Sequence, residues 1–250
     1  MASLVQYLGL ARSLVLYYAD PDQVHRAARF YRRFIRAGDL CFDVGAHVGS
    51  RTAAWTRLGA RTVAIEPLPH CARLLRLLYG RRRDVEVVEA ALGPVEGRTE
   101  LLVYDREPTI ATISAAWATR MQRERPGFAG VRWNRSVSVG VTTLDALVAR
   151  YGEPAFCKID VEGYDFEVLR GLSRPLRALS FECVPPAADL ALACMDRLLA
   201  LGRYEFNFSY GESMRLHSPT WGSRDDLAPL LRSLPADGPC GDVYARLRAA

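Results

Sequence analysis

From residue 40 onward, short apolar runs alternate with stretches that carry apolar residues at helical spacing. Each apolar run ends in Asp, Glu or Gly, as LCFDVGAHVG and TVAIEP illustrate. Inner strands of a parallel sheet are apolar throughout because helices cover both of their faces. The pattern therefore predicts an α/β fold with a mostly parallel sheet flanked by helices. The expected strands are 40–44, 62–66, 85–93, 96–105, 155–163, 177–184 and 241–247, with a hairpin over 204–218 turned at Gly211.

Helices are expected between these strands. They cover about 45–58, 70–79, 142–152, 164–171, 189–202 and 225–234. The stretch 105–136 has few periodic cues, and we expect it to be an insertion or lid over the carboxyl edge of the sheet.

Two further helices are expected at the start of the chain. The first covers residues 3–18 and places along one side Leu4, Leu8, Ala11, Val15 and Tyr18. The second begins after the capping residue Asp20 and ends at Gly38. We predict a helical extension over 1–37 and a single domain over 38–250. The first helix is expected to pack on this domain or on a second copy in a homo-oligomer; a peripheral membrane contact is the alternative.

Composition excludes several classes of protein. No run reaches the roughly 18 apolar residues that cross a bilayer, so we expect no integral membrane segment. The six cysteines are scattered, and the start of the chain lacks the features of a secretory signal; both favour reduced thiols in the cytoplasm. A net charge of +5 favours anionic partners slightly but is far from that of a dedicated nucleic-acid binder.

The turn after the first strand has the chemistry of a cofactor site. It reads Asp43-Val44-Gly45-Ala46-His47-Val48-Gly49. Glycines let a ligand approach the backbone, and the amides of the following helix attract a negative group. A pyrophosphate would be repelled by the acid before the first glycine. A ligand with one ammonium and one carboxylate group fits better, as at the methionine end of S-adenosylmethionine.

Acids also follow the second and third strands. Glu66 can accept both hydroxyls of an adenosine ribose, and Glu89 can accept from the adenine amino group with Ala90 beneath the ring. Carboxyl ends of parallel strands meet at one edge of the sheet, where ligands bind. The sequence therefore predicts an adenosine-containing cofactor without a pyrophosphate. The alternative is that both acids simply face water.

The segment KIDVEG carries the candidate catalytic residues. Side chains alternate along an extended chain, so Lys158, Asp160 and Glu162 share one side. Charged groups on an inner strand are costly under a helix, which places them at the open end beside the ligand. Lys158 is the only lysine in the chain. Asp160 is the candidate general base for a substrate hydroxyl.

The acids at these strand ends are also candidate ligands for a divalent cation. Glu182 ends the strand after the KIDVEG segment. With Asp160 it offers oxygen ligands, which suit Mg²⁺ or Ca²⁺ and would acidify a bound hydroxyl. No third ligand is evident from the sequence.

Six motifs between residues 38 and 184 carry a family resemblance. They are GDLCFDVGAHVGS, AIEPLP, VVEAALG, VTTLDAL, KIDVEGYDFEVLRGL and SFECV. In them the chain resembles the FkbM-type methyltransferases, a Rossmann-like class I group that depends on S-adenosylmethionine. The resemblance implies a seven-stranded, mostly parallel sheet. It also implies methyl transfer, usually to a hydroxyl of a sugar, polyketide or other secondary metabolite.

The resemblance also implies residue roles. Contacts to the cofactor are implied for Asp43, Gly45, Gly49 and Glu66, and an active-site role for 158–162. We also expect Ala46, Pro67 and Asp160 to contact the cofactor. The family usually has Asn where this chain has His47, which makes the contact to the methionine end a point of difference.

We therefore predict an S-adenosylmethionine-dependent O-methyltransferase whose acceptor is a small molecule with a hydroxyl group. A nucleic-acid methyltransferase and a non-catalytic cofactor-binding module are the alternatives. A dehydrogenase is disfavoured because GxGxxG is missing.

Overall fold

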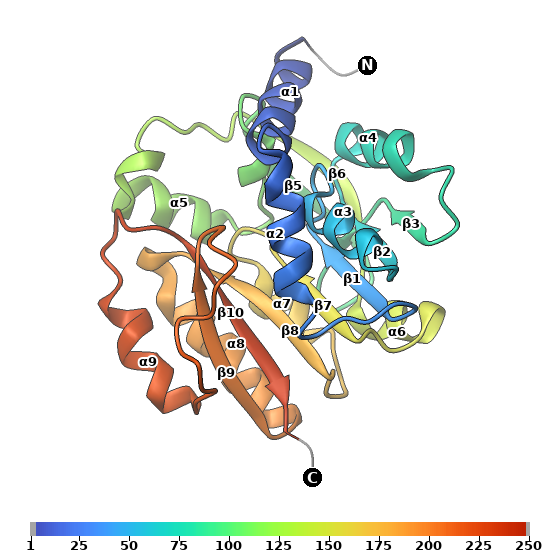
Figure 1. Cartoon of the computed structure of the whole chain (residues 1–250). Coiled ribbons are helices and arrows are strands. Elements are labelled where there is room, and N and C mark those ends of the chain that lie inside the picture. The colour runs from blue at the N-terminus through green and yellow to red at the C-terminus, as the bar shows by residue number, and fades with distance from the viewer. Residues whose placement is uncertain (1–3, 249–250) are drawn as a thin grey trace.

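This computed structural model describes residues 4–248, except the side chains of residues 4, 7 and 21. Within these residues seven strands form the central sheet (Figure 1). Their order is β3-β2-β1-β7-β8-β10-β9. All pairs from β3 to β8 are parallel, while β10 is antiparallel to both neighbours. The strands are β1 (Leu40–Val44), β2 (Arg61–Ile65), β3 (Val85–Val88), β7 (Phe156–Ile159), β8 (Ala178–Cys183), β9 (Tyr204–Tyr210) and β10 (Gly241–Leu247). The strand order reverses between β1 and β7, the place where open α/β sheets bind ligands.

Helices cover both faces of this sheet. On one face lie α2 (Pro21–Tyr31), α3 (Ser50–Arg57) and α4 (Pro69–Tyr79); on the other lie α6 (Leu144–Tyr151), α7 (Asp165–Arg170), α8 (Ala188–Leu201) and α9 (Arg224–Ser233). Buried Tyr31, Trp55 and Phe156 join α2 and α3 to the sheet. The predicted Rossmann-like, mostly parallel seven-stranded fold is confirmed.

A small second sheet stands beside the first, with the order β4-β6-β5. Its strands are β4 (Ala91–Leu92), β5 (Gly97–Val103) and β6 (Arg135–Thr142). The prediction of one strand over 85–93 is wrong, because Val88 ends the pairing with β2 and Ala91 pairs with Val141 of β6 instead. Strand β6 was not among the expected strands, although RSVSVGVT alternates polar and apolar residues, the pattern of a strand with one buried face.

The segment between β5 and β6 contains η1 (Pro108–Ile110), α5 (Ala115–Glu124) and η2 (Pro126–Phe128). It was expected to cover the carboxyl edge of the sheet. Pro108, Thr109, Ala111 and Ile113 line a cavity at that edge, so this part of the prediction is confirmed.

The predicted hairpin over 204–218 is wrong. Strand β9 pairs along its whole length with β10, and past Gly211 the chain forms a loop with one isolated bridge, from Phe206 to Gly222. The amide of Gly211 donates to the carbonyl of Cys240, just before β10. Strand β9 therefore pairs with the distant strand β10 and not with the residues that directly follow Gly211.

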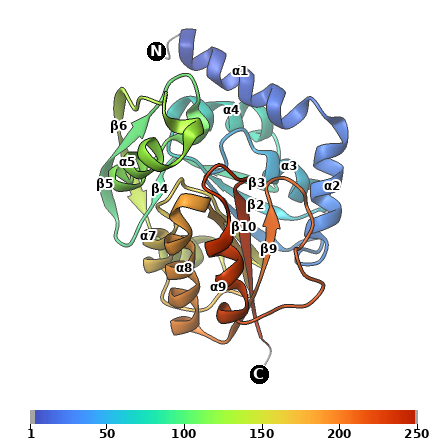
Figure 2. The same cartoon turned by 90° about the vertical axis from the view of Figure 1, so that its left-hand side faces the viewer.

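The N-terminal helix α1 (Leu4–Tyr18) lies across one end of the molecule, above the carboxyl edge of the sheet (Figure 2). It packs on the domain mainly through the side opposite to the predicted apolar stripe, of which Tyr18 alone among the described side chains contacts the domain. Gln6 and Ser13 are buried, whereas Leu8, Ala11 and Val15 are exposed; the side chain of Leu4 lies outside the described residues. Apolar and polar contacts together hold this orientation: Leu10 and Leu14 pack on the domain, and the Gln6 amide donates to the Asp105 carboxylate at 3.0 Å. No described helix is both long and apolar enough to span a bilayer.

Helix α2 begins as predicted, with the Asp20 side chain accepting from the amide of Asp22. It ends at Tyr31 rather than at Gly38, because residues 32–38 form turns that lead into β1. The domain boundary at residue 37 stays a prediction.

Candidate active site

The turn after β1 holds the backbone in a conformation that few residues adopt. Gly45 and Gly49 each have φ of +80°, and His47 has φ of +48°. A Cβ on Gly45 would lie 1.9 Å from the carbonyl oxygen of Asp160. A glycine is therefore required where this turn passes the end of β7. The amides of Gly45 and Ala46 both donate to Ile65, which fixes the turn on β2.

Asp43 is buried at the end of β1. One of its oxygens, Oδ2, accepts from the amide and the hydroxyl of Thr52 at 3.0 and 2.7 Å. Burial raises the pKa of this carboxyl, while the Thr52 hydrogen bond and Lys158 oppose the rise. Asp43 thus ties β1 to the first turn of α3 and also lines the polar cavity described below.

Glu66 follows β2 and is 4% exposed. Its two carboxylate oxygens accept from the amides of His47 and Leu68, each at 2.8 Å. Burial raises the pKa of Glu66 to about 7, although both amides oppose the shift. Each oxygen retains a lone pair for a further donor, as a ribose diol would supply.

The His47 ring is neutral at pH 7, because burial lowers its pKa to about 4. Its Nδ1 lies 3.6 Å from the sulfur of Cys71, and its Nε2 is buried without a hydrogen-bond partner among the described residues. His47 therefore lines the site as an uncharged group.

Two adjoining cavities meet at this edge of the sheet. The first is largely apolar and includes Ile65, Leu68, Ala90 and Leu92 beside Glu66 and Pro67. The second is polar and includes Tyr17, Asp43, Arg51, Lys158 and Glu212. Both are lined by Gly45, His47, Thr109, Asp160 and Glu162. The site thus has an apolar half and a charged half with Asp160 at their junction.

Glu89 stands apart from these cavities. It is exposed and forms an ion pair with Arg76 at 2.6 Å, whereas its neighbour Ala90 lines the apolar cavity. The chain leaves the main sheet after Val88, which turns the Glu89 side chain away. Its predicted contact to adenine therefore has no geometric support.

Lys158 is 3% exposed and lies between two carboxylates. Its Nζ contacts Asp160 at 2.9 Å and Asp242 of β10 at 3.2 Å. Burial lowers the pKa of Lys158, but the two carboxylates outweigh it and hold the pKa well above its usual range. The lysine stays charged and holds the Asp160 carboxylate at the cavity wall.

Three carboxylates converge next to Lys158. Oxygens of Asp160, Glu162 and Glu182 all lie within 4.8 Å of one another. Burial and mutual repulsion raise the pKa of Glu162 and of Glu182 well above the usual range. The Oε2 atom of Glu182 is buried without a hydrogen-bond partner among the described residues. Glu162 is a third carboxylate at this place, and sequence reasoning did not identify it as a candidate ligand.

The segment after β5 holds the turn that carries Glu162. The Thr112 hydroxyl donates to the Glu162 carbonyl at 2.7 Å, and Glu162 has φ of +54°. A Cβ on Gly163 would lie 2.1 Å from Trp117 of α5. The insertion is thus packed directly on the KIDVEG turn.

Several residues of the polar cavity were not predicted, namely Tyr17, Arg51, Thr109 and Glu212. Arg51 is 5% exposed and pairs with Glu212 at 2.8 Å. These residues come from α1, α3, η1 and the loop after β9, and none belongs to a motif. A sequence signal existed for the nearby Asp242, an acid directly before the three apolar residues Val243, Tyr244 and Ala245 of β10.

The strand order, the glycine turn and the acids at successive strand ends define a Rossmann-like methyltransferase that uses S-adenosylmethionine. Comparison with family models identifies residues 43–187 as a methyltransferase FkbM domain. The chain belongs to this family. It is an S-adenosylmethionine-dependent methyltransferase.

The solved structures that are similar to this chain include methyltransferases of several kinds. An O-methyltransferase from Bacillus cereus in complex with SAH has 14% identity and a TM-score of 0.49, covering 98% of this chain and 89% of that chain. A TehB-like methyltransferase from Corynebacterium glutamicum has 9% identity and a TM-score of 0.49, covering 97% and 96%. Precorrin-6y C5,15-methyltransferase from Geobacter metallireducens has 14% identity and a TM-score of 0.47, covering 89% and 86%. A search of curated proteins finds no match.

Proposed function

We propose that this methyltransferase acts on a hydroxyl group of a small acceptor such as a sugar, a polyketide or another secondary metabolite. The observation that carries the proposal is the position of Asp160, which lines both the apolar and the polar cavity. A carboxylate at this junction is suited to accept a proton from an acceptor hydroxyl next to a methyl donor.

The residues present fit S-adenosylmethionine, which supplies an electrophilic methyl group when bound. In our proposal Glu66 accepts the ribose hydroxyls, while Pro67 and Ala90 contact the adenosine. The turn from Gly45 to Gly49 receives the methionine end. The carboxylates that line the polar cavity, among them Asp43 and Asp160, favour the positive charge of a sulfonium and an ammonium group.

The chain's own residues would then orient and deprotonate the acceptor. Lys158 holds Asp160 in place, and Asp160 accepts the hydroxyl proton as the oxygen–carbon bond forms and the sulfur–carbon bond breaks. The products are a methyl ether, S-adenosylhomocysteine and a proton that passes from Asp160 to solvent. Most of the rate increase would come from aligning the two reactants.

The ribose contact is tested by comparing two glutamates that follow neighbouring strands. Replacing Glu66 by Ala removes acceptors for the ribose hydroxyls, and we expect S-adenosylhomocysteine to bind roughly 10- to 100-fold more weakly. The matched control is Glu89→Ala, which removes an exposed carboxylate outside the cavity. Its affinity should stay within about threefold of the unsubstituted protein. Calorimetric titration measures both. Equal losses in the two variants would contradict our placement of the adenosine.

The role of Asp160 is tested with Asp160→Asn, which keeps the shape of the side chain and removes its basicity. We expect turnover to fall by roughly 10²–10⁴ while cofactor affinity changes little. The assay follows transfer of a labelled methyl group to a panel of hydroxylated compounds. Glu153→Gln is the control, because Glu153 is exposed just before the opposite end of the same strand. Undiminished turnover in Asp160→Asn would eliminate Asp160 as the base.

We further propose that Asp160, Glu162 and Glu182 bind Mg²⁺. Three carboxylates within 4.8 Å suit a hard cation that prefers oxygen ligands. The unpartnered Glu182 oxygen supplies an unused ligand atom. Bound Mg²⁺ would offset the repulsion among the acids and lower the pKa of a coordinated hydroxyl.

Thermal unfolding tests this cation site without an acceptor. At a Mg²⁺ concentration about ten times its dissociation constant, we expect the midpoint to rise by roughly 3–6 °C. In Glu182→Gln the rise should be lost, because a neutral amide replaces one anionic ligand. Glu86→Gln, which alters an exposed acid on β3, should retain it. An unchanged midpoint in the original protein would refute the site, and full activity after chelation would exclude the cation from catalysis.

We propose the cytoplasm as the location. All six cysteines are free thiols, and all but Cys240 are buried. Unpaired cysteines are typical of a reducing compartment.

A further inference from the structure

Helix α1 presents an apolar surface to solvent. On its outward side and at its C-terminal end lie the exposed residues Val5, Leu8, Ala11, Arg12, Val15, Leu16 and Ala19. Leu8, Val15 and Leu16 are each more than 60% exposed. A surface helix ordinarily turns its polar side outward. Exposed apolar patches of this kind mark interaction sites.

Contacts on the inner side fix this orientation. The Tyr18 hydroxyl donates to the Val48 carbonyl at 3.0 Å, and Gln6 donates to Asp105. A Cβ on Gly9 would lie 2.8 Å from the Asp105 carbonyl oxygen. Rotating α1 to bury Leu8, Val15 and Leu16 would break these contacts and force larger side chains into the place of Gly9.

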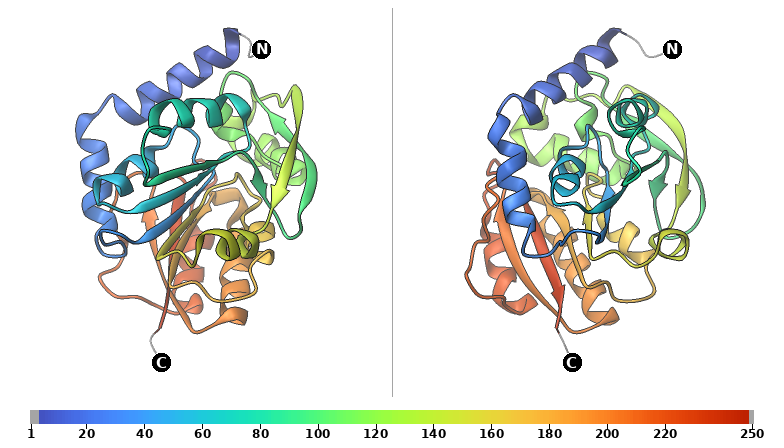
Figure 3. Two further views of the ribbon diagram at one scale, coloured as in Figure 1. Left: turned by 90° about the vertical axis from the view of Figure 1, so that its right-hand side faces the viewer. Right: turned by 45° about the vertical axis from the view of Figure 1, so that its right-hand side comes forward.

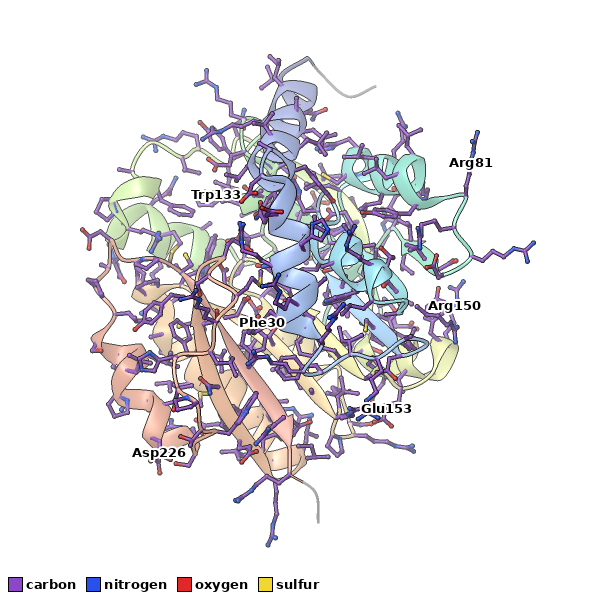
Figure 4. The ribbon with its side chains drawn as sticks, in the orientation of Figure 1. Phe30, Arg81, Trp133, Arg150, Glu153 and Asp226 are labelled. Atoms are coloured by element: carbon purple, nitrogen blue, oxygen red, sulfur yellow. The ribbon has the colours of Figure 1, made fainter. Side chains whose placement is uncertain are left out.

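The neighbouring helix α4 extends the same surface. Figure 3 shows α1 and α4 side by side, and Leu10 of α1 packs with Leu68 and Cys71 at the start of α4. On α4, Leu77 and Leu78 are 81% and 48% exposed. Neither helix contains an acidic residue. In the loop that follows α4, Arg81 extends away from the protein (Figure 4).

A basic groove lies between the two helices and β6. Its lining includes Gln6, His70, Arg73 and Arg135. The His70 Nε2 atom is buried without a hydrogen-bond partner among the described residues. The guanidinium of Arg135 also forms an ion pair with the carboxylate of Asp105, with 2.8 Å between Nη2 and Oδ1. The groove also adjoins the N-terminal end of α4, whose dipole favours an anion. This chemistry suits a phosphate group.

The charges on the outward face distinguish between two kinds of partner, a second copy of the chain and a lipid bilayer. Arg12 lies in the middle of the outward face. In a symmetric dimer built on α1, each copy would bring Arg12 near the other's Arg12, with no acid on either helix to compensate. An anionic bilayer instead offers both hydrocarbon and negative phosphates to the same face.

We propose that the outward faces of α1 and α4 dock on a bilayer of anionic phospholipid. Val5, Leu8, Val15 and Leu16 enter the boundary between headgroups and acyl chains, and the groove at Arg73 receives a lipid phosphate. The helix lies in the plane of the membrane and does not cross it. Tyr17, on the inner side of α1, lines the polar cavity, so the docked helix also forms part of the active-site wall.

Co-sedimentation with vesicles tests the docking. The full chain should bind vesicles of phosphatidylcholine with phosphatidylglycerol at least ~10-fold more strongly than vesicles of phosphatidylcholine alone. The double variant Leu8→Ser/Leu16→Ser should lose at least ~10-fold in binding to the anionic vesicles. Its control is Leu199→Ser, at an exposed leucine on α8. For the groove, Arg73→Glu should weaken binding, whereas Arg203→Glu, just before β9, should not.

Other outcomes overturn the proposal. Equal binding to both vesicle types would show that the charge argument is wrong. The absence of vesicle binding, with a dimer in sedimentation that Leu8→Ser/Leu16→Ser converts to monomers, would assign the face to a second copy. Thermal unfolding confirms that each variant is folded, and retained S-adenosylhomocysteine binding separates this test from that of the proposed function.

Discussion

The backbone after β1 and the backbone after β7 approach each other so closely that no side chain fits between them. The Asp160 amide donates to Val44 at 3.0 Å, and the Asp160 carbonyl lies where a Cβ of Gly45 would be. This contact occurs at the reversal of strand order, where parallel strands diverge and leave a crevice. It holds the cofactor turn and the KIDVEG segment at one place. Every other element of the site is arranged around it.

Buried charge is balanced within this crevice. Lys158 pairs with both Asp160 and Asp242, and Arg51 pairs with Glu212. Lys158 and Asp242 are both buried, and removing one partner of such a pair is strongly destabilising because it leaves the other charge uncompensated. This explains why a chain that otherwise uses arginine keeps one lysine here: a compact ammonium fits between two carboxylates. The balance leaves Glu162 and Glu182 without a cation among the described residues.

Much of this arrangement could be predicted, because the carboxyl ends of parallel strands share one edge. Asp43, Glu66 and Asp160 follow three such strands, and the structure brings all of them to the two cavities. Glu89 was expected at the same edge but lies outside both cavities, because the chain leaves the main sheet at that residue and enters the second sheet. Tyr17 and Glu212 reach the site from segments that no motif marks. The pattern of α1 predicted an apolar stripe, but most of that stripe faces solvent, because Leu10 and Leu14 pack on the domain from the other side and Gln6 there donates to Asp105.

Substitution of Gly45 tests the central contact most directly. Gly45→Ala adds a Cβ at 1.9 Å from the Asp160 carbonyl oxygen, at a φ of +80°. Gly38→Ala is the matched control, because Gly38 has φ of +85° with nothing within 4 Å of the added Cβ. Both variants carry a backbone strain of about 1–2 kcal/mol. Only Gly45→Ala also forces apart the backbone after β1 and the backbone after β7. We measure S-adenosylhomocysteine affinity by calorimetry and the free energy of unfolding by denaturant. The account predicts that Gly38→Ala binds normally while Gly45→Ala is less stable and binds at least ~100-fold more weakly, a loss of about 2.7 kcal/mol; equal affinity in the two variants would contradict it.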